Sequence, residues 1–474
     1  MAAKKESKTH GRIYTPDYIV LNIFDLSGYK GKNILRKHVI DNSCGDGAFL
    51  TLIVKEYCNE FLKQSSDTSL LQKELETYIH GIELDEVEAN KCKENMKNVG
   101  RLFDVTFNPD VIAANTLDVH CFDGKMDFVL GNPPYVRVHN LGDSYSQIKS
   151  FKFAEGGMTD LYITFYEVGL NMLNKNGVLS YIAPSSWFTS VAGTNMRNYF
   201  KQHSLIKSIC DLKHFQPFNA TTYTCITTLS FNKNDEIKYY LYDGCRKCPV
   251  FIEKLSYDDI CIDNSFYFAS KDNLKTLRRI LETDKKDDGV EVKNGFATLA
   301  DGIFISNKFD FSSKWIIPIY KASTGQWKEC IFPYFDGKLV SIDELKKDKK
   351  LFDYLSSFED SMSKRSLDVG TPWYGFGRSQ GIIDVAEKRI AINSLVRSVD
   401  DIKLQIIEPG SGIYSGLYIL TKLPIETIAT YLKNEEFVKY VSLLGKYKSG
   451  GYYTFSSKDI KKYIMYKVRG NQNE

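Results

Sequence analysis

The residues best suited to do chemistry in this chain form the tetrad Asn132-Pro133-Pro134-Tyr135, directly after the apolar run Asp127-Phe128-Val129-Leu130. An amino group on an aromatic ring is a poor nucleophile, because its lone pair is delocalised into the ring. Two acceptors, the Asn132 side-chain oxygen and the Pro133 carbonyl, can hold its N–H bonds and favour a more tetrahedral nitrogen. The two prolines make the turn rigid, and Tyr135 offers a stacking face for a base. The alternative interpretation is an ordinary proline turn at a strand end.

A second group of candidate residues lies upstream, in the run Asp41-Asn42-Ser43-Cys44-Gly45-Asp46-Gly47. Gly45 and Gly47 allow a tight turn and a close backbone approach to a ligand. The spacing is not G-x-G-x-x-G, so the dinucleotide fingerprint is absent. Glu83, in Gly81-Ile82-Glu83-Leu84-Asp85, ends the next apparent strand, where a carboxylate can accept both hydroxyls of a ribose. The alternatives are a plain helix-entry loop and a solvated helix N-cap at Asp85.

The elements that must position these residues alternate between strands and helices. The predicted strands are 38–41, 78–84, 126–130, 177–183 and 225–231, and the predicted helices are 47–63, 86–98 and 160–173. This alternation favours a mostly parallel α/β sheet covered by helices on both faces, with ligands at the carboxyl ends of the strands. Residues 232–293 are charged and are interpreted as a connection with short peripheral elements. Short aromatic and β-branched runs beyond them predict a separate α+β domain.

Composition restricts the class of protein without naming a partner. A length of 474 residues indicates two or three domains, and 43% hydrophobic with 26% charged residues is ordinary for a soluble protein. The net charge of +3 neither requires nor excludes nucleic acid. The start, MAAKKESKTH, lacks a signal peptide, and we expect a cytoplasmic protein with reduced cysteines and no membrane span. The lone pair Cys245 and Cys248 supplies too few ligands for structural zinc, so no metal is expected.

Taken together, these motifs resemble the γ-class, TaqI-like and Eco57I-type adenine-specific N6 DNA methyltransferases. The resemblance covers most of the chain and includes Gly11-Arg12-Ile13-Tyr14-Thr15-Pro16 ahead of the cofactor loop and Ala183-Pro184-Ser185-Ser186-Trp187 behind the tetrad. It implies a Rossmann-like, seven-stranded methyltransferase domain over residues 1–245. A connecting segment and an α+β target-recognition domain are implied over residues 246–474.

The resemblance also implies S-adenosylmethionine as the cofactor and assigns a site to it. The implied cofactor-binding residues are Tyr14, Thr15, Pro16, Asp41, Ser43, Cys44, Gly45, Gly47, Glu83, Leu84, Asn115 and Thr116. The implied catalytic residues are Asn132, Pro133, Pro134, Tyr135 and Phe218, with Phe215 as the alternative to Phe218 for the second stacking face. One departure is Asn115, where the family usually has Asp to hold the amino group of the cofactor adenine. An Asn carbonyl can still accept that bond without charge assistance, and Asp118 is the alternative acceptor.

The activity that the resemblance implies is site-specific methyl transfer to N6 of a flipped-out adenine in double-stranded DNA. The protein would be the modification enzyme of a restriction-modification system and a monomer. Any restriction endonuclease is expected to be a separate chain, because only about ten residues precede the first motif. Looser motifs at 294–298, 302–305, 374–380 and 446–452 resemble the family's recognition domain. Among them Arg378, Lys446 and Lys448 are expected to bind DNA.

Other functions remain as alternatives. RNA and protein-glutamine methyltransferases share the tetrad, although their extra domain usually lies in front of the catalytic one. A DNA-specificity protein with an inactive catalytic domain conflicts with the intact tetrad. Cytosine C5 chemistry needs a Cys nucleophile, typically after a Pro, and none of the 12 prolines precedes a Cys. The nuclease-like triplet Glu291-Val292-Lys293 is interpreted as chance.

Overall fold

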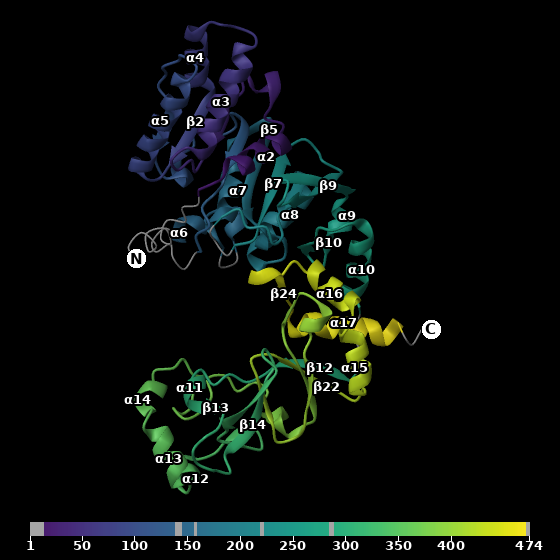
Figure 1. Ribbon diagram of the computed structural model, residues 1–474. Helices are drawn as coiled ribbons and strands as arrows, with labels where there is room; N and C mark the ends of the chain where they lie inside the picture. Colours follow the sequence, from purple (N-terminus) through teal and green to yellow (C-terminus); the bar gives the residue numbers. More distant parts are fainter. Residues whose placement is uncertain (1–13, 138–144, 156–158, 219–221, 284–288, 471–474) are drawn as a thin grey trace. The chain divides into compact units, whose positions relative to one another are not determined.

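The computed structural model describes residues 14–137, 145–155, 159–218, 222–283 and 289–470 (Figure 1). The chain divides into two compact units, Met1–Lys275 and Thr276–Glu474, and each unit is described by itself. Within the described ranges no helix is both long and apolar enough to cross a lipid bilayer.

The first unit is built around one mixed sheet. Its strands are β1 (Val39–Asp41), β2 (Ile79–Glu83), β3 (Asp110–Ala113), β4 (Met126–Gly131), β5 (Leu173–Pro184), β6 (Ile206–Asp211), β7 (Thr224–Ser230), β8 (Ile237–Asp243) and β9 (Cys248–Leu255). Their spatial order is β3-β2-β1-β4-β5-β7-β6-β8-β9. Strands β1 to β5 are parallel, whereas β7 lies antiparallel between β5 and β6. This confirms the predicted α/β, Rossmann-like class, and β1 to β7 are the seven strands expected.

Helices precede, connect and follow these strands along the chain. They are α2 (Asp17–Ser27), α3 (Ala48–Leu62), α4 (Thr68–Tyr78), α5 (Glu86–Arg101), α6 (Tyr145–Ile148), α7 (Leu161–Met172), α8 (Thr194–Gln202) and α9 (Tyr257–Ile260). The helix α10 (Lys271–Leu281) includes the boundary between the two units. Asp67 and Asp85 begin α4 and α5 by accepting backbone N–H groups of the first turn. Ile23 of α2, Ile53 of α3 and Val39 of β1 are fully buried in one core. Burial of these apolar side chains fixes the carboxyl ends of the strands relative to the helices.

The segment that the sequence predicted to be a connection contains two further strands. β8 pairs in parallel with β6, and β9 pairs antiparallel with β8, with Ile237 opposite Leu255. Most side chains of β9 are exposed or half-buried, because β9 is the edge of the sheet. An edge strand tolerates charged residues, which explains why this part of the sequence is typical of a connection. The predicted functional boundary between residues 245 and 246 stays a prediction.

The second unit combines small sheets with short helices, in line with the predicted α+β class. Its main strands are β12 (Val290–Asn294), β13 (Ile305–Ser306), β14 (Ile316–Lys321), β15 (Gln326–Ile331), β18 (Arg389–Ile392), β20 (Leu404–Ile407), β21 (Gly412–Tyr414) and β22 (Leu417–Thr421). They form the sheets β12-β22-β18-β20 and β13-β15-β14-β21. A third sheet joins β19 (Leu395–Val396), β24 (Tyr452–Thr454) and β23 (Tyr447–Lys448). Helices are α11 (Asp301–Phe304), α12 (Ile342–Lys346), α13 (Lys349–Ser356), α14 (Glu359–Met362), α15 (Ile425–Leu432), α16 (Glu435–Leu443) and α17 (Ser457–Gly470).

Candidate active site

The turn between β1 and α3 carries the two glycines of the predicted cofactor loop. Gly45 and Gly47 have positive φ values of 52° and 98°, which glycine adopts without the penalty of a Cβ. A Cβ on Gly47 would also lie 2.9 Å from the Cys92 sulfur of α5. The turn therefore needs glycine both for its backbone conformation and for its close packing against α5.

Glu83, the last residue of β2, joins this turn to the next strand end. Its Oε2 accepts the Gly45 N–H at 2.9 Å, and its Oε1 accepts the Asp85 N–H at 3.0 Å. An ionised carboxylate offers roughly four acceptor positions, so two positions remain for other donors. This geometry fits the role in ribose binding that the sequence predicts for Glu83.

Asp41, the last residue of β1, is a buried carboxyl group. Its Oδ1 accepts the Ser43 N–H at 3.0 Å, and a Cβ on Gly131 would lie 2.6 Å from the same oxygen. Burial, opposed by the Ser43 hydrogen bond and assisted by the charge of Glu83, raises the pKa of Asp41 to about 8. An ionised Asp41 therefore needs a positive partner, which makes this carboxylate a candidate for holding a cationic ligand.

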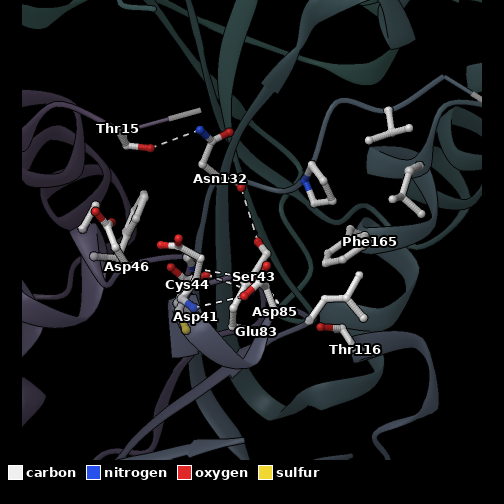
Figure 2. A pocket seen from close by; sticks show the side chains of 18 of the residues that line it. Thr15, Asp41, Ser43, Cys44, Asp46, Glu83, Asp85, Thr116, Asn132 and Phe165 are labelled. Carbon is white, nitrogen blue, oxygen red and sulfur yellow. Dashed lines mark hydrogen bonds between the residues drawn. The ribbon is translucent and has the colours of Figure 1, made fainter. Parts of the chain in front are cut away.

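Asn132 follows directly after β4 and contacts both Thr15 and Ser43 (Figure 2). Its Nδ2 donates to Thr15 Oγ1 at 3.0 Å, and its backbone carbonyl accepts from Ser43 Oγ at 3.3 Å. Its Oδ1 is buried and accepts no hydrogen bond from any described residue. Leaving a buried acceptor unpaired costs about 1–3 kcal/mol. This oxygen therefore marks a place where a donor group is expected to bind.

Tyr135 presents its ring beside Phe218. The Tyr135 hydroxyl donates to the Ile182 carbonyl at 3.0 Å, and its ring centroid lies 6.4 Å from that of Phe218. The alternative aromatic residue, Phe215, instead packs on Tyr242 at 4.8 Å between ring centroids. The structure thus brings Phe218 next to the tetrad, and the stacking role itself stays a prediction.

The predicted motifs converge on one cavity of about 670 Å³. The predicted site residues that line it are Tyr14, Thr15, Asp41, Ser43, Cys44, Gly45, Glu83, Leu84, Asn115, Thr116, Asn132 and Pro134. The predicted residues that are described but do not line it are Pro16, Gly47, Pro133, Tyr135 and Phe218. Gly11, Arg12 and Ile13 of the first motif lie outside the described residues.

Part of the cavity wall comes from apolar residues that the sequence did not single out. They include Val136, Ile148 of α6, and Leu161 and Phe165 of α7. Leu161 and Phe165 stand four residues apart and so share one helix face, but an ordinary core helix has the same spacing. Carboxylates on one side and apolar side chains on the other suit a ligand with a flat ring and polar or cationic groups. The cavity therefore fits S-adenosylmethionine in its chemistry.

Asn115 and Thr116 lie where β3 leads into the 3-10 helix η2 (Thr116–Asp118). Thr116 Oγ1 donates to the Asn42 carbonyl at 2.6 Å, which joins this turn to the turn after β1. Asn115 Oδ1 accepts the Leu117 N–H at 3.2 Å. Asp118 is outside the cavity lining and accepts a hydrogen bond from Asn115 Nδ2 at 2.9 Å. Of the two candidate acceptors, Asn115 is thus the one that lines the cavity.

The three side chains predicted to bind DNA belong to the second unit. Arg378 is half-exposed, with Nη1 3.3 Å from Asp368 Oδ1. Lys446 Nζ lies 2.5 Å from Asp459 Oδ2, whereas Lys448 is exposed. Arg378 and Lys446 would therefore exchange a carboxylate for a phosphate on binding DNA. These three contacts with DNA stay predictions.

Comparisons with known proteins bear on these features. Residues 39–218 match the Eco57I restriction-modification methylase family. The type II methyltransferase M.BstVI of Geobacillus stearothermophilus is 24% identical over 79% of this chain and 75% of its own length. The type II restriction enzyme and methyltransferase RM.Eco57I of Escherichia coli is 23% identical over 87% of this chain, which spans about half (52%) of that relative. The type IIL restriction-modification enzyme MmeI, solved in complex with DNA, shares the fold with a TM-score of 0.65 at 15% identity, over 94% of this chain and 64% of MmeI.

The sheet order defines a Rossmann-like α/β domain of the methyltransferase type, and MmeI shares this fold. Residues 39–218 are similar to the Eco57I-type, γ-class methyltransferases, and the relatives M.BstVI and RM.Eco57I extend this similarity over most of the chain. The family match begins at β1 and ends at Phe218. It therefore includes the cofactor loop, Glu83 and the tetrad.

Proposed function

We propose that this chain transfers a methyl group from S-adenosylmethionine to N6 of adenine in double-stranded DNA, at a specific sequence, as the modification enzyme of a restriction-modification system. The observation that carries the proposal is Asn132 Oδ1, a buried acceptor without a partner among the described residues. Thr15 holds the other end of the same amide. Type II methyltransferases among the relatives and the DNA bound to MmeI support DNA as the substrate.

Two acceptors on a rigid turn are the chain's contribution to the chemistry. Asn132 Oδ1 accepts one N–H of the amino group, and the Pro133 carbonyl accepts the other. Both bonds favour the tetrahedral nitrogen that methyl transfer requires, and acceptors fixed in advance need no reorganisation during the reaction. S-adenosylmethionine, when bound, supplies an electrophilic methyl group on a sulfonium. Glu83 would hold the ribose of this cofactor and Asn115 its adenine. Asp41 would hold its cationic end.

A base inside a duplex cannot reach the buried oxygen of Asn132, so the target adenine has to leave the stack. Extrusion of a base costs a few kcal/mol. Stacking against aromatic side chains returns about 1–3 kcal/mol per base contact. Tyr135, held by its bond to Ile182, and Phe218 beside it are the side chains that would supply this contact.

Two other functions remain to be tested against this one. An RNA or protein-glutamine methyltransferase would need the same acceptor at Asn132. The unit at 276–474, which follows the catalytic unit and is included in the match to MmeI, favours DNA instead. A DNA-specificity protein without catalysis would not need a buried, oriented acceptor.

The test is to follow labelled methyl from S-adenosylmethionine into unmodified duplex DNA, with RNA and cell protein in parallel reactions. After hydrolysis, we expect the label in N6-methyladenine of DNA alone. Label in cytosine, in RNA or in glutamine would overturn the proposal. No transfer from a bound cofactor would favour the inactive specificity protein. Sequencing of methyladenine positions in the product gives the recognition sequence.

Phe218→Ala is expected to lower kcat/KM for DNA by about 10- to 100-fold, because a stacking contact of about 1–3 kcal/mol is lost. Phe215→Ala is the matched control, since Phe215 packs on Tyr242 away from Tyr135. Steady-state kinetics on a duplex with adenine at the target position measure the rate, and the fluorescence of a second duplex with 2-aminopurine at that position reports the unstacking of the base. Equal losses in the two variants would contradict the assignment of Phe218.

A further inference from the structure

Three polar side chains beside the cavity form a closed ring of hydrogen bonds. Asn115 Nδ2 donates to Asp118 Oδ2 at 2.9 Å and to Gln147 Oε1 at 3.4 Å. Gln147 Nε2 donates to Asp118 Oδ1. Asn115 lines the cavity, as does Ile148, the neighbour of Gln147 in α6. The ring therefore joins η2 to α6 at the wall of the cavity.

The ring determines how the Asn115 amide is turned. An amide has a donor end and an acceptor end of nearly equal shape, so its hydrogen-bond partners decide its orientation. The ionised carboxylate of Asp118 can only accept, and it therefore holds the donor ends of both Asn115 and Gln147. The Asn115 oxygen is left outside the ring, where it accepts the Leu117 N–H and keeps a second lone pair.

We propose that Asp118 and Gln147 are positioning residues that hold Asn115 as an acceptor for the amino group of an adenine nucleoside in the cavity. The proposal rests on the proposed function, which assigns S-adenosylmethionine to this cavity. A freely turning amide could present its NH₂ end to a purine with a 6-carbonyl group, and it would not discriminate. The ring prevents this rotation and makes position 115 selective for a 6-amino purine. The family usually has a carboxylate at position 115 to hold this amino group. Here Asn115 takes that role, and the carboxylate of Asp118, three residues later, keeps Asn115 in the accepting orientation.

The test compares two ligands by titration calorimetry on the full chain: S-adenosylhomocysteine, and its analogue with a 6-carbonyl group in place of the 6-amino group. The natural protein is expected to prefer the amino form by about tenfold, the value of one hydrogen bond. Asp118→Asn is expected to lose most of this preference, because an amide at position 118 can also donate and Asn115 can then turn. The affinity for the 6-carbonyl analogue is expected to rise, because the turned amide of Asn115 can donate to its carbonyl group.

A rescue variant separates positioning from general damage. Asn115→Asp in the Asp118→Asn background carries two acceptor oxygens at position 115, so its orientation no longer matters and the preference is expected to return. Gln147→Ala is expected to reduce the preference by a smaller factor, because Asp118 still holds Asn115. Asp123→Asn is the matched control, since Asp123 pairs with His120 outside the ring.

An unchanged preference in Asp118→Asn would overturn the proposal, as would an equal loss of affinity for both ligands or a failed rescue. If the natural protein binds neither ligand, the cofactor assignment and this proposal fail together. Normal ligand preference in a protein that methylates no DNA would support the ring and overturn the proposed function alone. The two proposals are therefore distinguishable in one set of measurements.

Discussion

Asn132→Ala is expected to lower the rate of methyl transfer by about 10²–10³-fold, the usual effect of removing one fixed polar group that stabilises a transition state. The affinity for the cofactor is expected to change little, because Glu83 and the hydrogen-bonded ring that holds Asn115 are both unchanged. The large loss of rate is expected because the Asn132 side-chain oxygen is buried, has no described partner, and is oriented by Thr15. Single-turnover methylation and calorimetric titration of the cofactor measure the two quantities separately.

Two further variants show whether the oxygen itself is responsible. Thr15→Val removes the acceptor that orients the amide, and we expect a smaller loss of rate than in Asn132→Ala. Asn174→Ala is the control, because Asn174 is near the start of β5 and bonds to Asp127 at 3.1 Å. A fall in cofactor affinity that accounts for the whole loss of rate in Asn132→Ala would show that Asn132 is a binding residue instead.

Three parts of the predicted site follow a short apolar run. Asp41, Glu83 and Asn132 each come at or directly after the end of a buried strand. Because β2, β1 and β4 are parallel neighbours, residues at their carboxyl ends meet at one edge of the sheet. The position of each residue at the end of a predicted strand is therefore enough to predict that these three side chains lie close together.

Other parts depend on contacts that no local pattern encodes. Ile148 and Phe165 line the cavity, but their sequence context is that of ordinary core residues. The orientation of Asn115 depends on Gln147, thirty-two residues later. The departure from Asp at position 115 therefore could be noticed in the sequence, while its compensation could be found only in the structure.

Lys446 of the second unit illustrates the same limit for electrostatics. A lysine in a Gly-bearing loop, such as Lys446, is typical of a phosphate-binding residue. In the structure Asp459, thirteen residues later, approaches Lys446 Nζ to 2.5 Å and also accepts the Ser456 N–H at 2.6 Å. Sequence gives the sign of a charge, but the neighbours that neutralise it are fixed by folding. Lys448, which is exposed, is for this reason the simpler candidate for a contact with DNA.

The buried carboxyl group of Asp41 predicts a pH dependence of the whole fold. Its pKa is 3.8 in an unfolded chain and about 8 in the native protein, so the native state binds more protons between these values. The free energy of unfolding therefore falls as pH rises from about 4 to about 8, by up to about 5 kcal/mol from this group. Asp41→Asn is expected to match the natural protein near pH 4 and to be more stable near pH 8. Urea denaturation across this range measures the difference.

The same group is expected to couple the affinity for a cationic ligand to pH. A sulfonium and an ammonium group near Asp41 favour its ionised form, so binding releases a proton below about pH 8 and the affinity for S-adenosylmethionine rises with pH by up to about tenfold per unit. In Asp41→Asn the affinity should be weaker at pH 8 and nearly independent of pH. S-adenosylhomocysteine, which lacks the sulfonium charge, should show a shallower dependence. A pH-dependent affinity that persists in Asp41→Asn would assign the proton to another group. On this hypothesis, binding of a positive ligand offsets the destabilising effect of the buried, ionised Asp41 carboxylate.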